Sequence, residues 1–508
     1  MKSALHIVLF FMLLQTTYSQ TSLQDLQLKN GKYTVGFTHY TATDSTRTYI
    51  SKSDINANAN FRPIPISIWY PSTTETKNRQ PLSVLNYMEV LKEEEEWEDL
   101  PNYFLLDWFY YKNTPENQKH LKETTTAFKD VPHAKGIFPV ILYAPGFEYS
   151  SIENFALCEL LASHGYIVIA SPSRGTTSKR FKKPERAIET QARDLEFLIK
   201  EIASFPSADM NSVGTMGFSF GGISNVLLQM RNTSIKANMS LDGTIRYNLN
   251  LLKSTPFYDI KKATIPFMHL AQKEIPAAIM KAQNIPDSLN THFTFYDALT
   301  ESDAYKIRLH HLSHSYFSTL GVLFEERDPK QDKSDQQIMA SYQLATMYSL
   351  HFMNAYLKND QSSLAFITNT PQENNIPKQL ITIDSKKASK KPTDFYAFLH
   401  RAKQQAYSNL YELYTQMKKE HPSLLIPEGV LNTLGLQLIF NPSKATEGIA
   451  IYEFAITLYP ESANLHDSLA EGYVYLGNHK KAIANFKKIL VLDPTNQNAI
   501  TRLKQLEK

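Results

Sequence analysis

"TMGFSFGGIS", residues 215–224, places one serine among glycines directly after an apolar run. Ser219 has a glycine two positions before it and another two positions after it, which gives the pattern G-x-S-x-G. The run "SVGTMGF" (212–218) predicts a strand, and a helical pattern begins at about Gly222. A serine at a turn from strand to helix is typical of a nucleophile elbow, where small neighbours let the chain reverse sharply. We therefore predict that the Ser219 hydroxyl is a nucleophile at the carboxyl end of a sheet.

The segments around this serine alternate between strand and helix patterns. "FPVILYA" (138–144) and "GYIVIA" (165–170) are short apolar runs, typical of strands that are buried on both faces. Helical patterns cover 152–163 and 188–204, further strands are expected at 235–242, 264–271 and 292–298, and a long helix is expected at 335–357. This alternation predicts an α/β fold with a mostly parallel sheet and helices on both faces.

A serine hydroxyl is a weak nucleophile without a base, and in this fold the partners follow in the order serine, acid, histidine. The cluster "RLHHLSHSYF" (308–317) follows the last expected strand, where a loop can reach the elbow, and within it we favour His314 as the base. Between residue 240 and the end of the expected hydrolase domain at 357, the histidines are His269, His292, His310, His311, His314 and His351. Their spacing lacks a clear third type of metal ligand, so we expect neither a metal nor another cofactor.

Two carboxylates are candidates for the acid. Asp242, in "SLDGT", ends the strand after the elbow helix. Glu274, in "HLAQKE", follows the next strand, which is the more usual place for the acid in this fold. Either carboxylate can hold an imidazole in the correct tautomer, so the pattern of the residues leaves both open.

Several stretches between about Gly31 and Leu357 resemble the platelet-activating-factor acetylhydrolase and dienelactone-hydrolase-like branch of the α/β-hydrolases. They are "GKYTVGF", "PISIWYPS", "PVILYAPGFEYSSIENFALCELLASHGYIVIASPSRG", "RDLEFLI", "GFSFGG", "SLDG" and "SHSYF". The resemblance implies an α/β-hydrolase fold and a serine hydrolase of carboxylic esters, with short acyl or phospholipid-derived substrates and a role in lipid degradation.

The resemblance also implies roles for individual residues. In the acetylhydrolases the acid follows the strand after the nucleophile, which favours Asp242 over Glu274. The two backbone N–H groups that bind the oxyanion map onto Phe147 and Phe220. The chain departs from the family at Phe218, where the family often has histidine, and at 145–146, where Pro-Gly replaces His-Gly. Both departures shape the pocket, so the resemblance leaves the identity of the substrate open.

The first 19 residues have the pattern of a secretory signal. Lys2 precedes an apolar run over 5–14, and "TYSQ" offers small residues for cleavage after Ser19. This pattern predicts an extracytoplasmic protein, periplasmic or secreted. No later run is long and apolar enough for a transmembrane segment. Cys158 is the single cysteine, so an intramolecular disulfide is impossible.

We expect the hydrolase domain to cover residues 20–357. A helical insertion rich in aromatic residues is expected at 85–128, either as a cap over a pocket or as ordinary core. Its acidic stretch "KEEEEWEDL" (92–100) indicates a solvated helix face. Residues 358–395 are polar, with prolines and lysines, and indicate a linker.

The last part of the chain, 396–508, is expected to be a small all-α domain. Similar residues recur 34 positions apart, which predicts repeats of the tetratricopeptide (TPR) type at 429–462 and 463–496. The second repeat matches well, and the first is degenerate. Such repeats bind a protein or peptide partner in their concave face, or they only pack on the hydrolase domain.

The net charge of +3 over 508 residues leaves no electrostatic footprint for nucleic acid. The favoured function is hydrolysis of small-molecule esters through an acyl-enzyme. A peptidase or a lipase would use the same three side chains. The alternative from another class is a protein-interaction module based on the TPR repeats, with a specialised or inactive hydrolase domain.

Overall fold

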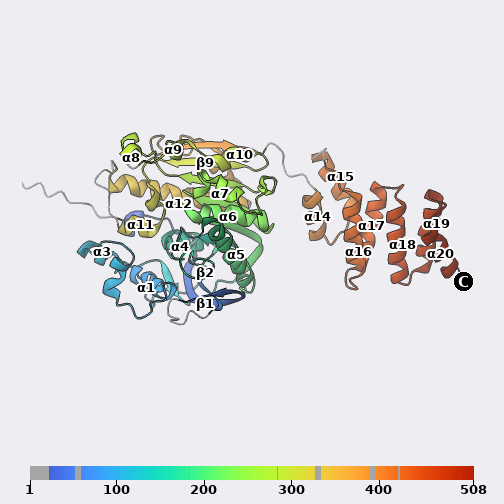
Figure 1. Cartoon of the computed structure of the whole chain (residues 1–508), viewed down its shortest axis with the longest axis horizontal. Helices are drawn as coiled ribbons and strands as arrows, with labels where there is room; N and C mark the ends of the chain where they lie inside the picture. Colours follow the sequence, from blue (N-terminus) through green and yellow to red (C-terminus); the bar gives the residue numbers. More distant parts are fainter. Residues whose placement is uncertain are drawn as a thin grey trace, which may run out of the picture. The chain divides into compact units, whose positions relative to one another are not determined.

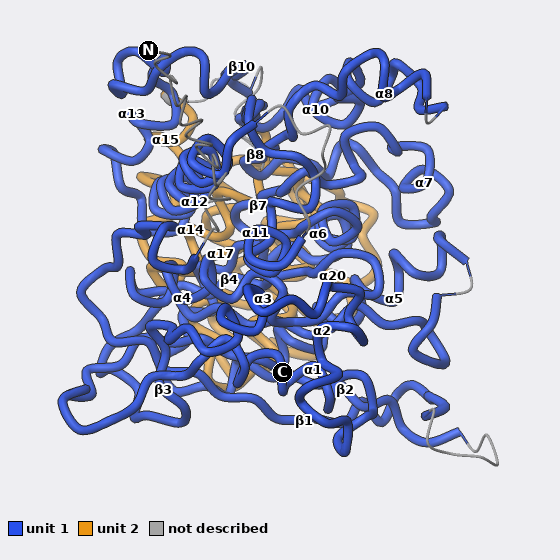
Figure 2. The backbone as a smooth tube through the Cα atoms, turned by 90° about the vertical axis from the view of Figure 1, so that its left-hand side faces the viewer, with its two compact units in different colours: residues 1–389 blue, residues 390–508 orange. Residues whose placement is uncertain are grey.

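The computed structural model describes residues 22–51, 59–181, 183–282, 284–325, 333–388, 395–420 and 424–507. The chain divides into two compact units, Met1–Ser389 and Lys390–Lys508, which Figure 2 shows in different colours. The predicted signal peptide, residues 1–19, lies outside the described residues and stays a prediction.

A ten-stranded mixed sheet forms the centre of the first unit. Its order is β10-β9-β8-β7-β6-β4-β5-β2-β1-β3. The strands from β5 to β9 in this order run parallel, and antiparallel pairs join β1 to β2, β2 to β5 and β9 to β10. The bounds are β1 (Thr34–Tyr49), β2 (Asn60–Ser72), β3 (Ala127–Lys129), β4 (Phe138–Ala144), β5 (Ile167–Ala170), β6 (Ala208–Phe218), β7 (Ile235–Leu241), β8 (Phe267–Ala271), β9 (Ala304–Leu309) and β10 (Ile381–Lys386).

Helices cover both faces of this sheet (Figure 1). Successive side chains of a strand point to opposite faces, so each buried strand contributes to two cores. In β4, Ile141 and Tyr143 pack in the core with α4 (Phe155–Ser163) and α12 (Asp335–Leu357), whereas Val140 and Leu142 pack in the core with α5 (Pro184–Ile202). The elbow helix α6 (Phe220–Arg231) packs against α5. This arrangement is the α/β fold with a mostly parallel sheet that the alternation of patterns predicts, and it agrees with the α/β-hydrolase fold that the resemblance implies.

The expected strand at 292–298 is wrong. Its last five residues form a short helix, α10 (Thr294–Ala298), and the strand before the histidine cluster is β9. The pattern of "HFTFYDA" alternates, and Phe293 and Phe295 are both buried. Tyr296 and Leu299 are buried as well, however, and residues 295, 296 and 299 have helical spacing. The expected linker also differs, because 358–395 contains α13 (Gln361–Thr368) and β10, which pairs with β9.

The expected insertion at 85–128 contains three α-helices and one short 3-10 helix, and its last residues belong to β3, which pairs with β1. The remaining helices of the unit are short. They are η1 (Gln24–Leu26), α1 (Val84–Glu94), η2 (Asn102–Phe104), α2 (Leu105–Trp108), α3 (Pro115–His120), η3 (Thr244–Arg246), α7 (Leu249–Lys253), η4 (Ile260–Lys262), α8 (Ala277–Ala282), α9 (Ser288–Thr291), η5 (His314–Phe317) and α11 (Thr319–Phe324).

The second unit is helical and has a core of its own, in which Phe398, Tyr452 and Phe486 are buried. Each of the two windows 429–462 and 463–496 spans two helices, and their assignment to the TPR type stays a prediction. In the described part of the chain, no helix is both long and apolar enough to cross a membrane. The helices are α14 (Phe395–Gln404), α15 (Leu410–Glu420), α16 (Glu428–Ile439), α17 (Ala445–Leu458), α18 (Ala463–Tyr475), α19 (His479–Leu492) and α20 (Gln497–Leu506).

Candidate active site

Ser219 occupies the turn between β6 and α6 in a backbone conformation that side chains rarely adopt, with φ 51° and ψ −116°. Close approach of the chain explains the glycines beside it. A Cβ on Gly217 would lie 2.5 Å from the backbone of Gly221, and a Cβ on Gly221 would lie 2.0 Å from the carbonyl oxygen of Ala144. The strained serine and its glycines therefore form the sharp strand-to-helix turn expected of a nucleophile elbow.

The structure brings Ser219, His314 and Asp242 together, although they are far apart in the sequence. The Nε2 of His314 lies 3.0 Å from the Oγ of Ser219, and its Nδ1 lies 2.6 Å from the Oδ2 of Asp242. The imidazole with its proton on Nδ1 donates to the carboxylate and accepts from the serine. The ring of Phe218 stacks on His314 at 5.0 Å between centroids, which limits the positions that the imidazole can take.

Asp242 is buried, with a side chain only 2% exposed. Burial alone would raise its pKa, but the hydrogen bond and the charge of His314 act in the opposite direction. The Nη1 of Arg246, 3.8 Å from Oδ1, and the backbone N–H of Gln272, 3.0 Å from the same oxygen, add to this effect. These partners outweigh burial and hold the pKa of Asp242 well below its ordinary value, so the carboxyl is an anion.

The other candidates for base and acid lie elsewhere. Glu274 is exposed in the loop after β8, and the carboxylate that contacts His314 is Asp242. The rings of His269, His310 and His351 contact the hydroxyls of Ser240, Thr382 and Ser363. Among the described residues, no group of three or more His, Cys, Asp or Glu side chains is arranged to hold a metal ion.

The loop after β4, residues 145–151, lies against the serine, and we call it the oxyanion loop. A Cβ on Gly146 would lie 3.5 Å from the Cβ of Ser219. Phe147 follows Gly146, and its ring lies 5.5 Å from that of Phe220, the first residue of α6. The two peptide groups proposed as oxyanion donors therefore lie beside the nucleophile. The first N–H groups of a helix have no acceptor within the helix, which leaves that of Phe220 available to a substrate.

Two buried glutamates hold the oxyanion loop, and analysis of the sequence missed both. Glu153 accepts a hydrogen bond from the backbone N–H of Gly146 at 3.0 Å. Glu94, at the end of α1, accepts hydrogen bonds from Ser150 and from Ser151, including the Ser151 N–H at 3.2 Å. The expectation of a solvated acidic face at 92–100 is thus wrong for Glu94, which is 2% exposed. The only signal in the sequence was the acidic run itself, which does not say which carboxylate turns inward.

A cavity of about 800 Å³ lies between the helical insertion and the oxyanion loop. Aromatic side chains line it from both sides, and Lys179 and Arg180 form ion pairs there with Glu95 and Glu148. Tyr149, in its wall, packs edge-on against Phe218, which connects the cavity to the ring that stacks on His314. The aromatic residues of the lining are Trp97, Trp108, Phe109, Tyr110, Tyr111, Phe147 and Tyr149.

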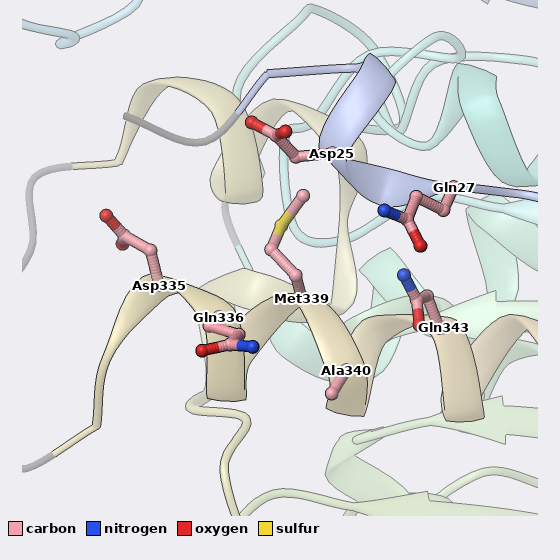
Figure 3. Close-up of a pocket in the computed structure, with 7 residues that line it drawn as sticks. All are labelled: Asp25, Gln27, Asp335, Gln336, Met339, Ala340 and Gln343. Carbon is pink, nitrogen blue, oxygen red and sulfur yellow. The ribbon is translucent and has the colours of Figure 1, made fainter. Parts of the chain in front are cut away.

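Figure 3 shows a different hollow, at η1 and the first turns of α12. Polar side chains make up most of its lining: Asp25, Gln27, Asp335, Gln336 and Gln343, with Met339 and Ala340. None of these is a candidate catalytic residue, so this hollow is separate from the chemistry at Ser219.

No protein-family model matches this sequence, and no curated protein matches it. Among solved structures, the chain is similar to a ferulic acid esterase from Streptomyces cinnamoneus. The two share 18% sequence identity with a TM-score of 0.46, over 69% of this chain and 96% of that chain. A likeness this distant says nothing about the substrate, so the chemistry follows from the site alone.

Proposed function

We propose that this chain is a serine hydrolase of carboxylic esters that acts through an acyl-enzyme intermediate. One observation carries the proposal: a continuous chain of contacts runs from a buried carboxylate through His314 to the hydroxyl of Ser219. Nucleophilic catalysis at an ester carbonyl needs these three groups: a nucleophile (Ser219), a general base (His314) and an acid that orients the base (Asp242).

In the first half of the reaction, His314 removes the proton from Ser219 while the serine oxygen attacks the ester carbonyl carbon. The carbonyl oxygen becomes an oxyanion beside the N–H groups of Phe147 and Phe220. The carbon–oxygen bond to the alcohol then breaks, and His314 returns the proton to the departing alkoxide. The products of this half are the free alcohol and an ester on Ser219.

In the second half, water replaces the alcohol. His314 removes a proton from the water as its oxygen attacks the acyl carbon, and the same donors hold the second oxyanion. The bond to the serine oxygen breaks, and the proton passes to Ser219. Asp242 stays ionised throughout and stabilises the imidazolium that forms twice in each cycle.

The cavity supports a proposal for the substrate. A short acyl group, as in the acetylhydrolase-like branch, needs far less room than about 800 Å³. We therefore place a larger apolar part on the alcohol side of the ester, phospholipid-derived or otherwise, against the aromatic walls of this cavity. The signal pattern at 1–19 supports an extracytoplasmic location, periplasmic or secreted.

The test is hydrolysis of p-nitrophenyl esters, from acetate to palmitate, by the purified chain and by Ser219→Ala. We expect activity that falls with acyl length in the wild type and a loss of at least about 10⁴-fold in the variant. Ser224→Ala is the matched control, because its hydroxyl bonds the carbonyl of Phe220 within α6 and does not contact His314. Equal activity of Ser219→Ala and wild type would contradict the proposal.

A fluorophosphonate, which bonds covalently to an activated serine, separates this proposal from the interaction-module alternative. Labelling at Ser219 in the folded protein supports a working hydrolase. An unlabelled protein with a cooperative thermal transition favours the alternative, in which the helical second unit binds a protein or peptide partner. Activity that rises toward palmitate would instead favour a lipase, and turnover of peptides would favour a peptidase.

A further inference from the structure

We propose that Glu153 is a positioning residue that holds the oxyanion loop as a neutral carboxylic acid, and that losing its proton turns the hydrolase off at alkaline pH. The inference rests on the proposed function, because it assigns a role beside the same serine. It concerns a group that the reaction cycle above does not use. Glu153 lies just before α4, and its residue is 0% exposed.

The carboxyl of Glu153 lies directly behind the loop that carries the candidate oxyanion donor. Its Oε1 accepts two hydrogen bonds, from the hydroxyl of Tyr143 at 2.7 Å and from the N–H of Gly146 at 3.0 Å. Gly146 in turn packs against Ser219 and precedes Phe147. Glu153 therefore holds the N–H of Gly146, and the N–H that would bind the oxyanion belongs to the next residue, Phe147.

The contacts of Glu153 fit a protonated acid. Both donors go to Oε1, as to the carbonyl oxygen of a carboxylic acid, and Oε2 is buried with no partner among the described residues. An ionised oxygen in that position would lose its solvation without compensation. In the neutral acid the proton lies on Oε2, because both donors bond Oε1, and a neutral O–H in this position loses less solvation than an anionic oxygen.

Among the residues that the structure describes, no cation is one of the influences on the pKa of Glu153. Burial is the largest influence, the bonds from Tyr143 and Gly146 oppose it, and the charge of Glu94 adds to it, so that the pKa of Glu153 rises to about 8. The groups that face it are Tyr143 on β4, Glu94 on α1, Tyr111 after α2, Tyr149 in the oxyanion loop and Cys158 on α4. Glu325, after α11, acts on Tyr111 and Tyr149.

The protonation state matters because negative charge develops in front of this loop during the reaction. As a neutral acid, Glu153 fixes Gly146 without adding charge. As an anion, it would place a full negative charge behind the N–H groups that must stabilise the oxyanion, in an interior where charges are poorly screened. Activity is then proportional to the fraction of protein in which Glu153 keeps its proton. Well above the pKa, this fraction falls roughly tenfold per pH unit.

The experiment compares the pH dependence of kcat/KM, between pH 6 and 10, in the wild type and in Glu153→Gln. The amide keeps an oxygen acceptor for Gly146 and cannot ionise. We expect the wild type to lose activity above about pH 8 and the variant to stay within a few-fold of the wild type at pH 7 without that loss. An alkaline loss that is unchanged in Glu153→Gln, or absent from the wild type, overturns the proposal.

Glu159→Gln is the matched control. Glu159 lies on α4, the helix that Glu153 precedes; it is also buried, and burial also raises its pKa. Its partners, however, are Tyr87 and Thr126 rather than the oxyanion loop. The profile of Glu159→Gln should follow that of the wild type, and an equal effect of the two variants would make the alkaline loss a general property of buried carboxyls and overturn the proposal.

A second variant and a direct measurement separate this proposal from the function itself. Glu153→Leu removes the acceptor, so we expect kcat to fall by about tenfold or more at pH 7 with little change in KM, and unchanged kcat contradicts a positioning role. Infrared difference spectra of wild type minus Glu153→Gln should show a protonated-carboxyl band at pH 7 that disappears above pH 9, and a missing band refutes the neutral acid even in a protein without esterase activity. Failure of ester hydrolysis and of fluorophosphonate labelling in the wild type refutes the proposed function instead.

Discussion

The histidine side and the oxyanion side of Ser219 each contain a buried carboxyl group, and the pKa values of the two are shifted in opposite directions. Burial acts in the same direction on Asp242 and Glu153, because it raises the pKa of any carboxyl. Asp242 has His314, Arg246 and a backbone N–H as partners, and its pKa falls. Glu153 has a tyrosine hydroxyl, a backbone N–H and a second glutamate, and its pKa rises to about 8. The difference shows that a neighbouring cation, rather than depth in the protein, decides which carboxyl is an anion.

This difference matches the charges that the proposed reaction creates. An imidazolium forms at His314, beside the anion of Asp242. An oxyanion forms at the loop that Glu153 supports without a charge. An anion beside the imidazolium and a neutral acid beside the oxyanion both lower the energy of the transition state. A neutral group beside the imidazolium and an anion beside the oxyanion would raise it. The site is therefore organised before the substrate arrives, by residues from different parts of the chain.

The largest expected effect comes from Asp242→Asn, which removes the charge on the histidine side. An amide at this position can favour the wrong tautomer of His314 and no longer stabilises the imidazolium. We expect kcat on p-nitrophenyl acetate to fall by about 10⁴-fold. Glu274→Gln, which changes the other candidate acid, should stay within about twofold of the wild type. A larger loss in Glu274→Gln than in Asp242→Asn would reverse the assignment of the acid.

The histidine side could be predicted from the sequence, and the support of the oxyanion side could not. Local signals and one rule of order point to Ser219 and His314 but leave both Asp242 and Glu274 open as the acid, and only the resemblance to the acetylhydrolases favours Asp242. Glu153 precedes a helical pattern, where an acidic residue is usually a favourable surface group, and no periodicity tells which way it turns. Glu153 accepts its hydrogen bond from Gly146 only in the folded chain. The same holds for Glu94, whose partners lie in a loop more than fifty residues away.

The same limit applies to the secondary structure. Buried parallel strands such as 138–144 are continuous apolar runs and are easy to recognise. The edge strand β10 is exposed along much of its length, so its sequence "ITIDSK" resembles a polar linker. The alternation of "HFTFYDA" suggested a strand, because the packing of Phe295 and Leu299 that selects a helix is decided by tertiary contacts.

The next largest effect is on stability, and it sharpens the comparison on the oxyanion side. Glu153 binds a proton in the folded state up to about pH 8, whereas in the unfolded chain it ionises near 4.5. Its contribution to stability is complete below pH 4.5 and is lost as the pH rises to about 8, by up to about 1.4 kcal/mol per pH unit. Glu153→Gln lacks this loss. We therefore expect the free energy of unfolding by urea to rise in the variant relative to the wild type between pH 5 and 8. A constant difference across this range would contradict the raised pKa.

The smallest predicted effect concerns Arg246, the cation that distinguishes Asp242 from Glu153. Its guanidinium is 1% exposed and lies near the rings of Tyr247 and Phe293, with a nitrogen 3.8 Å from Asp242. In Arg246→Gln this positive charge is lost, so the negative charge of Asp242 beside His314 is less offset. The acid limb of the profile of kcat/KM against pH should move upward by about one pH unit or less. Arg246→Lys keeps a positive charge and should shift the limb less. Equal shifts in the two variants, or a shift to lower pH in Arg246→Gln, would show that Arg246 acts on the site through packing alone, and that the contrast between the two carboxyls has to come from His314.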